Sequence, residues 1–125
     1  MRNIGMPEYI AMANEVTAQL LASPRFANLA GQEAKVVLGV PTNNSANWNL
    51  RVQDIFDTVR NTLANSRTVR VFSTGYTDVD YVLNSEFTST RTQGRNESTL
   101  TYTLTLTTLE GEYLGAWSAH RAFVS

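Results

Sequence analysis

The segment 99–107, TLTYTLTLT, constrains the fold more than any other part of the chain, because threonine alternates with a large apolar residue over nine positions. Successive side chains of a β-strand point to opposite faces of a sheet, whereas a helix needs apolar residues every three or four positions. One face of this strand is therefore apolar and must be buried, while threonine suits a face that meets water. The apolar residues are Leu100, Tyr102, Leu104 and Leu106, and the threonines are Thr99, Thr101, Thr103, Thr105 and Thr107.

Two neighbouring segments extend this sheet. Residues 80–93 and 112–124 are long and rich in β-branched and aromatic side chains. Turn-forming residues near 92–97 and at 110–112 separate them from the alternating segment, so the three segments predict an antiparallel meander. We expect the helices to pack on the leucine side, which leaves the threonines more exposed on average than the apolar residues between them.

The first part of the chain predicts two helices and two strands. The short apolar runs at 35–40 and 68–72 are typical of strands, and a strand, helix, strand order implies a right-handed parallel pair. Asn47 or Asn49 can cap the helix between these two strands. Its core face is expected to carry Val52, Ile55, Phe56, Val59 and Leu63, and an earlier helix at 6–23 is expected to bury Met6, Ile10, Ala13, Val16 and Leu20.

These elements predict an α/β (α+β) fold in one globular domain, residues 1–125. The predicted sheet is mixed and five-stranded, with a β-α-β unit followed by an antiparallel three-strand meander. Two main helices pack on one face of this sheet. A chain of 125 residues buries roughly two-thirds of the surface that its unfolded form exposes, which suffices for one core.

Composition excludes several classes of function. The net charge is -1 and 17% of the residues are charged, so no basic field attracts nucleic acid. The absence of cysteine removes disulfides, thiolate metal sites and a cysteine nucleophile. No stretch approaches the roughly 18 to 20 apolar residues of a membrane span, and the start MRNIGMPEY lacks the basic-then-apolar order of a signal peptide.

The sequence offers little support for catalysis. The loop 41–49 has the position of a phosphate cradle but contains no glycine, so it is interpreted as an asparagine-rich turn and helix cap. His120 is the only histidine, and no serine elbow or oxyanion motif accompanies it. We therefore predict no catalytic residue and a dispensable His120.

Metal and cofactor sites find no better support. Asp78 with Asp80, and Glu110 with Glu112, supply only two carboxylates each, fewer than calcium needs. Both pairs flank turns, where carboxylates keep a loop end soluble. The sequence predicts no metal and no cofactor.

Recognition of a partner protein is the remaining interpretation. Trp117 lies in a predicted strand and is assigned to the core, whereas other aromatic residues stand in polar loops. A polar sheet face flanked by arginines is a second candidate for docking. The predicted partner-contact residues are Trp48, Tyr76, Arg91, Arg95, Thr103 and Thr105.

Several segments, taken in order, resemble the globular domain of the LpoB-type lipoproteins. They are VVLGVPTNNSAN (36–47), VRNTLANSRTVRVF (59–72), DYVLNSEF (80–87) and LTLTTLEGEYLGAWS (104–118). The resemblance covers about residues 8–124. It implies a mixed sheet backed by helices, similar to the amino-terminal domain of TolB.

The resemblance also implies a function. Such proteins are periplasmic activators, tethered to the outer membrane by a lipidated cysteine, that dock on a non-catalytic domain of a bifunctional penicillin-binding protein. The chain would then be a monomeric or weakly dimeric binding module, with membrane contact only through an N-terminal lipid anchor that this sequence does not contain. The connection 73–80 is shorter than the helix-containing connection usual in the family.

Two alternatives remain open at this point. One is a subunit of an envelope secretion or assembly complex, such as the CsgG-like pore lipoproteins, which would form closed rings. The other is a small-ligand binder or enzyme, which would need a deep polar pocket around His120.

Overall fold

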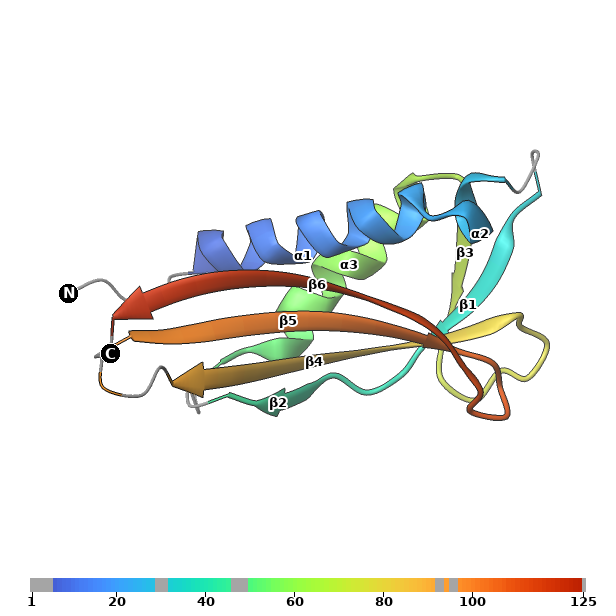
Figure 1. The fold of residues 1–125 in the computed structure, drawn as a ribbon. Coiled ribbons are helices and arrows are strands. Elements are labelled where there is room, and N and C mark those ends of the chain that lie inside the picture. The colour runs from blue at the N-terminus through green and yellow to red at the C-terminus, as the bar shows by residue number, and fades with distance from the viewer. Residues whose placement is uncertain (1–5, 29–31, 46–49, 92–93, 95–96, 125) are drawn as a thin grey trace.

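Helices cover one face of a six-stranded mixed sheet in the computed structural model, which describes residues 6–28, 32–45, 50–91, 94 and 97–124 (Figure 1). The strands are ordered β3-β1-β4-β5-β6, and the short β2 pairs with β4. The predicted α/β class with a mixed sheet is confirmed. In chain order the elements are α1 (Met6–Ala22), α2 (Pro24–Ala27), β1 (Ala34–Leu38), β2 (Thr42–Asn44), α3 (Val52–Asn65), β3 (Val69–Phe72), β4 (Tyr81–Arg91), β5 (Glu97–Thr107) and β6 (Tyr113–Val124).

The parallel half of the sheet is built around β1. Val36 is aligned with Val71 in β3 and with Tyr81 in β4, and both pairings are parallel. Because α3 lies between β1 and β3 in the chain, the predicted β-α-β unit with a parallel strand pair is confirmed.

The antiparallel half is the predicted meander of β4, β5 and β6. Gly111 has a φ of 91° in the turn between β5 and β6, a conformation that glycine adopts without steric cost. The pairing of β5 with β6 shifts register between Leu106 and Thr107, where the turn begins.

The core lies between the helices and the leucine face of β5. Leu100, Tyr102, Leu104 and Leu106 are buried in one cluster with side chains of α1 and α3, whereas Thr99, Thr101, Thr103, Thr105 and Thr107 are only partly buried. The prediction that the threonines are the more exposed set, with both helices on the leucine side, is confirmed.

The predicted core face of α1 needs a correction. Met6 and Ile10 were expected in the core, but each is 36% exposed, while Tyr9 and Met12 are buried. The ring of Tyr9 meets the edge of Phe87 in β4 with centroids 5.8 Å apart. The helix packs against α3 as well as the sheet, so its buried stripe is wider and rotated relative to the spacing that the leading Met6 suggests.

The strand count also differs from the prediction. The sequence was read as five strands, and the structure adds β2 within the loop that follows β1. Asn43 of β2 is aligned with Phe87 of β4, in parallel. Three polar residues show no alternating pattern, so only the tertiary pairing reveals this strand.

Tyr102 places a phenol in the middle of the core. Its hydroxyl and that of Ser85 are buried, and neither has a hydrogen-bond partner of acceptable geometry among the described residues. Burial raises the pKa of Tyr102 above its usual range, and the Ser85 hydroxyl offsets part of that rise. The folded protein therefore holds the neutral phenol more strongly than the unfolded chain does.

This raised pKa predicts an alkaline loss of stability. Below about pH 10, the usual tyrosine pKa, both states carry the proton; above it the unfolded chain releases the proton first, so the free energy of unfolding falls by about 1.4 kcal/mol per pH unit. Tyr102→Phe should remove this contribution and leave stability at neutral pH unchanged or slightly higher. Urea unfolding of both proteins at neutral and alkaline pH measures it, and equal slopes would contradict the prediction.

Candidate functional site

The sheet surface opposite α1 and α3 is the broadest candidate for an interaction, and we call it the open face. Its central side chains are linked in pairs across β5 and β6. Thr103 Oγ1 lies 2.9 Å from Ser118 Oγ, and Thr101 Oγ1 lies 2.9 Å from His120 Nδ1. Strand register adds residues of β4, so the open face comprises Asn84, Glu86, Thr88, Thr99, Thr101, Thr103, Thr105, Thr107, Ser118 and His120.

One end of the open face is covered by the connection between β3 and β4, residues 73–80. Val37 alternates with core residues of β1 and therefore points to the open face, yet it is only 5% exposed. Phe72 is aligned beside Val37, and the ring of Tyr76 lies over Phe72 with centroids 5.5 Å apart. The connection thus crosses β1 on the open face and leaves Tyr76 exposed at its outer surface.

Backbone contacts fix this crossing. The N–H of Asp80 donates to the carbonyl oxygen of Lys35 at 2.8 Å, and the N–H of Lys35 donates to Asp80 Oδ2 at 2.9 Å. Thr74 Oγ1 donates to the carbonyl oxygen of Leu38 at 3.3 Å. The eight-residue connection contains no helix, as its length predicted.

The predicted partner-contact residues divide into three groups. Tyr76, Thr103 and Thr105 share the open face. Arg91 is exposed at the end of β4, but alternation along the strand assigns it to the face of Leu83 and Phe87, so it does not flank the threonines as expected. The other two predicted residues, Trp48 and Arg95, lie outside the described residues.

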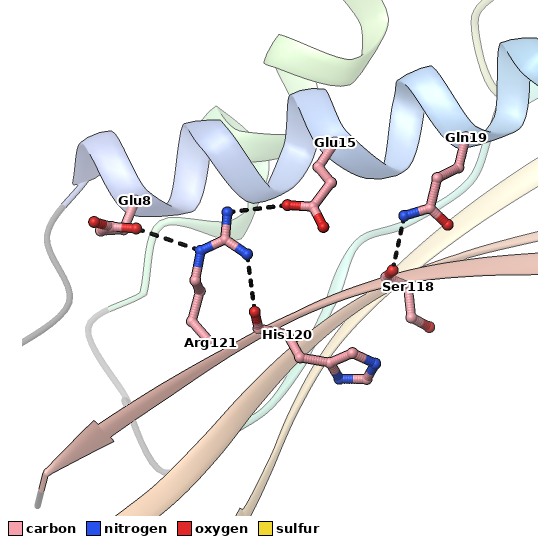
Figure 2. A network of polar contacts seen from close by, with 6 residues as sticks. All are labelled: Glu8, Glu15, Gln19, Ser118, His120 and Arg121. Atoms are coloured by element: carbon pink, nitrogen blue, oxygen red, sulfur yellow. Dashed lines mark hydrogen bonds and ion pairs between the residues drawn. The ribbon is translucent and has the colours of Figure 1, made fainter.

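A second polar constellation joins α1 to β6, and we call it the α1–β6 clamp (Figure 2). Arg121 Nη2 lies 3.0 Å from Glu15 Oε2, and Arg121 Nε lies 3.4 Å from Glu8 Oε2. Arg121 Nη1 donates to the carbonyl oxygen of His120 at 2.8 Å, and Gln19 Nε2 donates to the carbonyl oxygen of Ser118 at 3.1 Å. No sequence pattern indicated these contacts.

The α1–β6 clamp holds side chains of α1 and β6 over the outer edge of β6. Exposed ion pairs contribute at most about 1 kcal/mol each, so its four contacts are not a major source of stability. They instead place side chains on carbonyl oxygens along the outer edge of β6. Natural proteins cover strand edges in this way to prevent unwanted pairing.

His120 lies beside the clamp but has an exposed side chain on the open face. In the part of the chain that the structure describes, the His120 ring is hydrogen-bonded to Thr101 and to no acidic side chain. Within the described ranges, no group of three or more metal-ligating side chains is found. None of the described helices is long and apolar enough to cross a membrane.

We expect His120→Ala to leave any binding or stimulatory activity within a few-fold of the original. The substitution removes one hydrogen bond on an exposed surface, which contributes little. Titration of the partner protein with both forms measures the effect. A loss of about a hundredfold would be the size of a general-base contribution and would favour an enzyme instead.

A groove runs beside the first residues of β6. Its volume is about 500 Å³, and one wall is the turn between α1 and α2 at Ser23, Pro24 and Arg25. The other wall is the segment Tyr113–Trp117. Trp117 was predicted to be in the core, but it is only half-buried and packs against the core from its side, whereas Tyr113 is 65% exposed. The sequence did not indicate that these two segments meet.

One family of known proteins matches the chain in sequence. The sequence model of the family described as "Peptidoglycan-synthase activator LpoB" matches residues 8–80, more than half of the chain. No curated protein sequence matches the chain.

Solved structures share the fold. The C-terminal domain of LpoB from Escherichia coli aligns with a TM-score of 0.62 at 14% identity, and that from Salmonella enterica with 0.59 at 17% identity. In each case the alignment covers 94% of this chain and 99% of the other. A PelC dodecamer from Paraburkholderia phytofirmans aligns with a TM-score of 0.51 at 15% identity, over 75% of this chain and 74% of the other.

Proposed function

The chain belongs to the LpoB family of peptidoglycan-synthase activators, and from this premise we propose that it is a non-catalytic module that docks on a bifunctional penicillin-binding protein and stimulates it. The module acts as one domain, residues 1–125, in the periplasm. A lipid anchor at the N-terminus of the full-length protein holds it at the outer membrane.

One observation carries this proposal. The family match over residues 8–80 and the shared fold over 94% of the chain agree on the same relatives, although the sequence identity is low. An activator of this kind needs a specific surface and no chemistry of its own. The open face offers such a surface, with paired hydroxyl groups and an exposed tyrosine at one end.

The direct test combines the purified chain with a purified bifunctional penicillin-binding protein from the same organism and its lipid-linked disaccharide substrate. We expect a specific complex and a several-fold faster formation of glycan chains at saturating concentration. The control is the synthase with an unrelated protein of equal size. Absence of both binding and stimulation would contradict the proposal.

A ring-forming subunit of an envelope complex is the second candidate. A PelC protein that shares this fold at 15% identity is a dodecamer, so ring assembly is the alternative that we propose to test. Light scattering coupled to gel filtration distinguishes the two, because the activator is expected to be a monomer or weak dimer. A closed ring of many copies would favour the second candidate.

A further inference from the structure

The outer edge of β6 is covered along only part of its length. This strand is the last in the sheet order and, among the described strands, pairs with β5 alone. The α1–β6 clamp covers the edge at residues 118–121, where Gln19 and Arg121 bind strand carbonyl oxygens. Helix α1 ends at Ala22, before it reaches the first residues of β6.

At the start of β6, the backbone N–H and C=O groups of alternate residues point outward from the edge of the sheet. In an antiparallel pair, successive residues direct their N–H and C=O groups alternately to the partner strand and away from it. The carbonyls of Ser118 and His120 are bound by side chains beyond the edge, so both residues belong to the outward set. Ala116 is two residues before Ser118 and therefore presents its N–H and C=O outward, past the end of α1.

The groove borders this stretch of backbone. Leu114 and Trp117 on the strand side pack against the core, and the Trp117 ring lies over Gly115, 3.3 Å from where a Cβ would stand. On the helix side, Ser23 Oγ donates to the carbonyl oxygen of Leu20, and Pro24 begins α2. Both walls are thus held by local structure, which reduces the cost of ordering them on binding.

Arg25 gives this groove a positive charge. Its guanidinium carbon lies 5.6 Å from the centroid of the Tyr81 ring, and no carboxylate pairs with it among the described residues. Arg25 Nη1 also donates to the Tyr81 hydroxyl at 3.5 Å, so Tyr81 holds the guanidinium beside the groove without neutralising its charge. A carboxylate of a bound molecule would neutralise the positive charge of Arg25.

We propose that the segment Tyr113–Trp117 and the neighbouring groove bind an extended segment of a partner polypeptide, which adds to the edge of β6 and places an acidic side chain at Arg25. Strand addition supplies backbone hydrogen bonds, and pockets beside the edge select alternate side chains of the bound segment. This surface adjoins the open face, since Ala116 is aligned with Thr105, but it is built on the strand edge and the groove beside the turn after α1. It would exist whether or not the open face docks on a synthase.

A second copy of the chain fits this edge poorly when the pairing is centred on Ala116. Pairing of two β6 strands about a two-fold axis at Ala116 would set residues 118–120 of each copy against residues 112–114 of the other. Residues 118–120 are the part of the edge that the α1–β6 clamp already covers. An extended segment of a few residues, at about 3.3 Å per residue, meets no such obstacle.

The test begins with a library of random twelve-residue peptides displayed on phage, selected against the whole chain and, in parallel, against Ala116→Pro. Proline at position 116 removes an outward N–H without removing a bond to β5, because edge strands tolerate proline where the N–H faces solvent. We expect the enriched peptides to carry at least one aspartate or glutamate. Synthetic copies of them should bind Ala116→Pro about tenfold more weakly than the unaltered chain. Ala116→Gly, which keeps the N–H, should retain binding.

Two further variants make the result specific. Ala122→Pro changes an outward position of the same strand beyond the clamp and should bind the peptides normally. Arg25→Glu should weaken binding by about tenfold or more, because it opposes the peptide carboxylate. If Ala116→Pro fails to fold, amide exchange in the unaltered chain replaces it: peptide should slow the exchange of the Ala116 N–H.

Three outcomes would overturn the proposal. The first is that no peptide is enriched on the unaltered chain relative to the parallel selection on Ala116→Pro. The second is that neither Ala116→Pro nor Arg25→Glu changes the affinity for the peptides. The third is that the chain itself forms a dimer that Ala116→Pro dissociates. Stimulation of a synthase is measured separately. Its loss or retention therefore does not decide whether the edge of β6 binds peptides.

Discussion

Phe56→Ala is expected to lower the free energy of unfolding by about 3–5 kcal/mol, the usual cost of truncating a buried phenylalanine. Phe56 is 2% exposed and lies on the face of α3 that also carries Val59 and Leu63. Removing the ring leaves a cavity between α3 and the rest of the core, because the surrounding elements relax only partly. Urea unfolding with an unchanged dependence on denaturant measures the loss.

A substitution on the other side of the same helix is the control. Asn61 is exposed, so Asn61→Ala should change stability by no more than about 0.5 kcal/mol. If Phe56→Ala costs less than about 1 kcal/mol, the face of α3 is not packed as described. A fold with a different helix orientation would then be required.

Thr103→Glu combined with Thr105→Glu is expected to abolish binding to the penicillin-binding protein while the domain stays folded. Both threonines lie side by side on the open face and are half-buried, and Thr103 is linked to Ser118. Two carboxylates in the centre of a docking surface would be buried without partners, which costs several kcal/mol per charge. Stimulation of glycan synthesis and direct binding should both fall by more than about a hundredfold.

The matched control adds the same charge elsewhere. Asn61→Glu with Ala64→Glu places two carboxylates on the exposed side of α3 and should leave binding unchanged. Thermal unfolding of both double variants shows that each is folded. Unchanged affinity of the threonine variant would make the open face a plain solvent surface and move the docking site to another part of the chain.

The sequence predicted those elements whose side chains repeat with a clear period. The alternation from Thr99 to Thr107 identified both faces of β5, and the spacing of Ile55, Val59 and Leu63 identified the buried face of α3. The same reasoning misplaced Met6 and Ile10, because a helix that packs against two elements buries a stripe that its first apolar residue does not define.

Features made by distant parts of the chain left no such signal. Gln19 and Ser118 are 99 residues apart, and neither residue type in isolation indicates a partner. The groove likewise forms from the turn after α1 and the start of β6. Of the predicted contact residues, Tyr76 is exposed, and its contact with a partner stays a prediction, whereas the face of Arg91 depends on its register with β5 and not on its charge.

The contact between the first helix and the last strand decides when this chain can finish folding. Among the described elements α1 comes first in the chain and β6, the strand that it clamps, comes last, so their contact joins the most distant parts of the fold. Helix α3 can meet α1 earlier, but until β6 is added, all 11 residues of β5 form an unpaired strand edge. We therefore expect a chain truncated before residue 113 to aggregate, because the pairing of β6 is the step that covers the edge of β5.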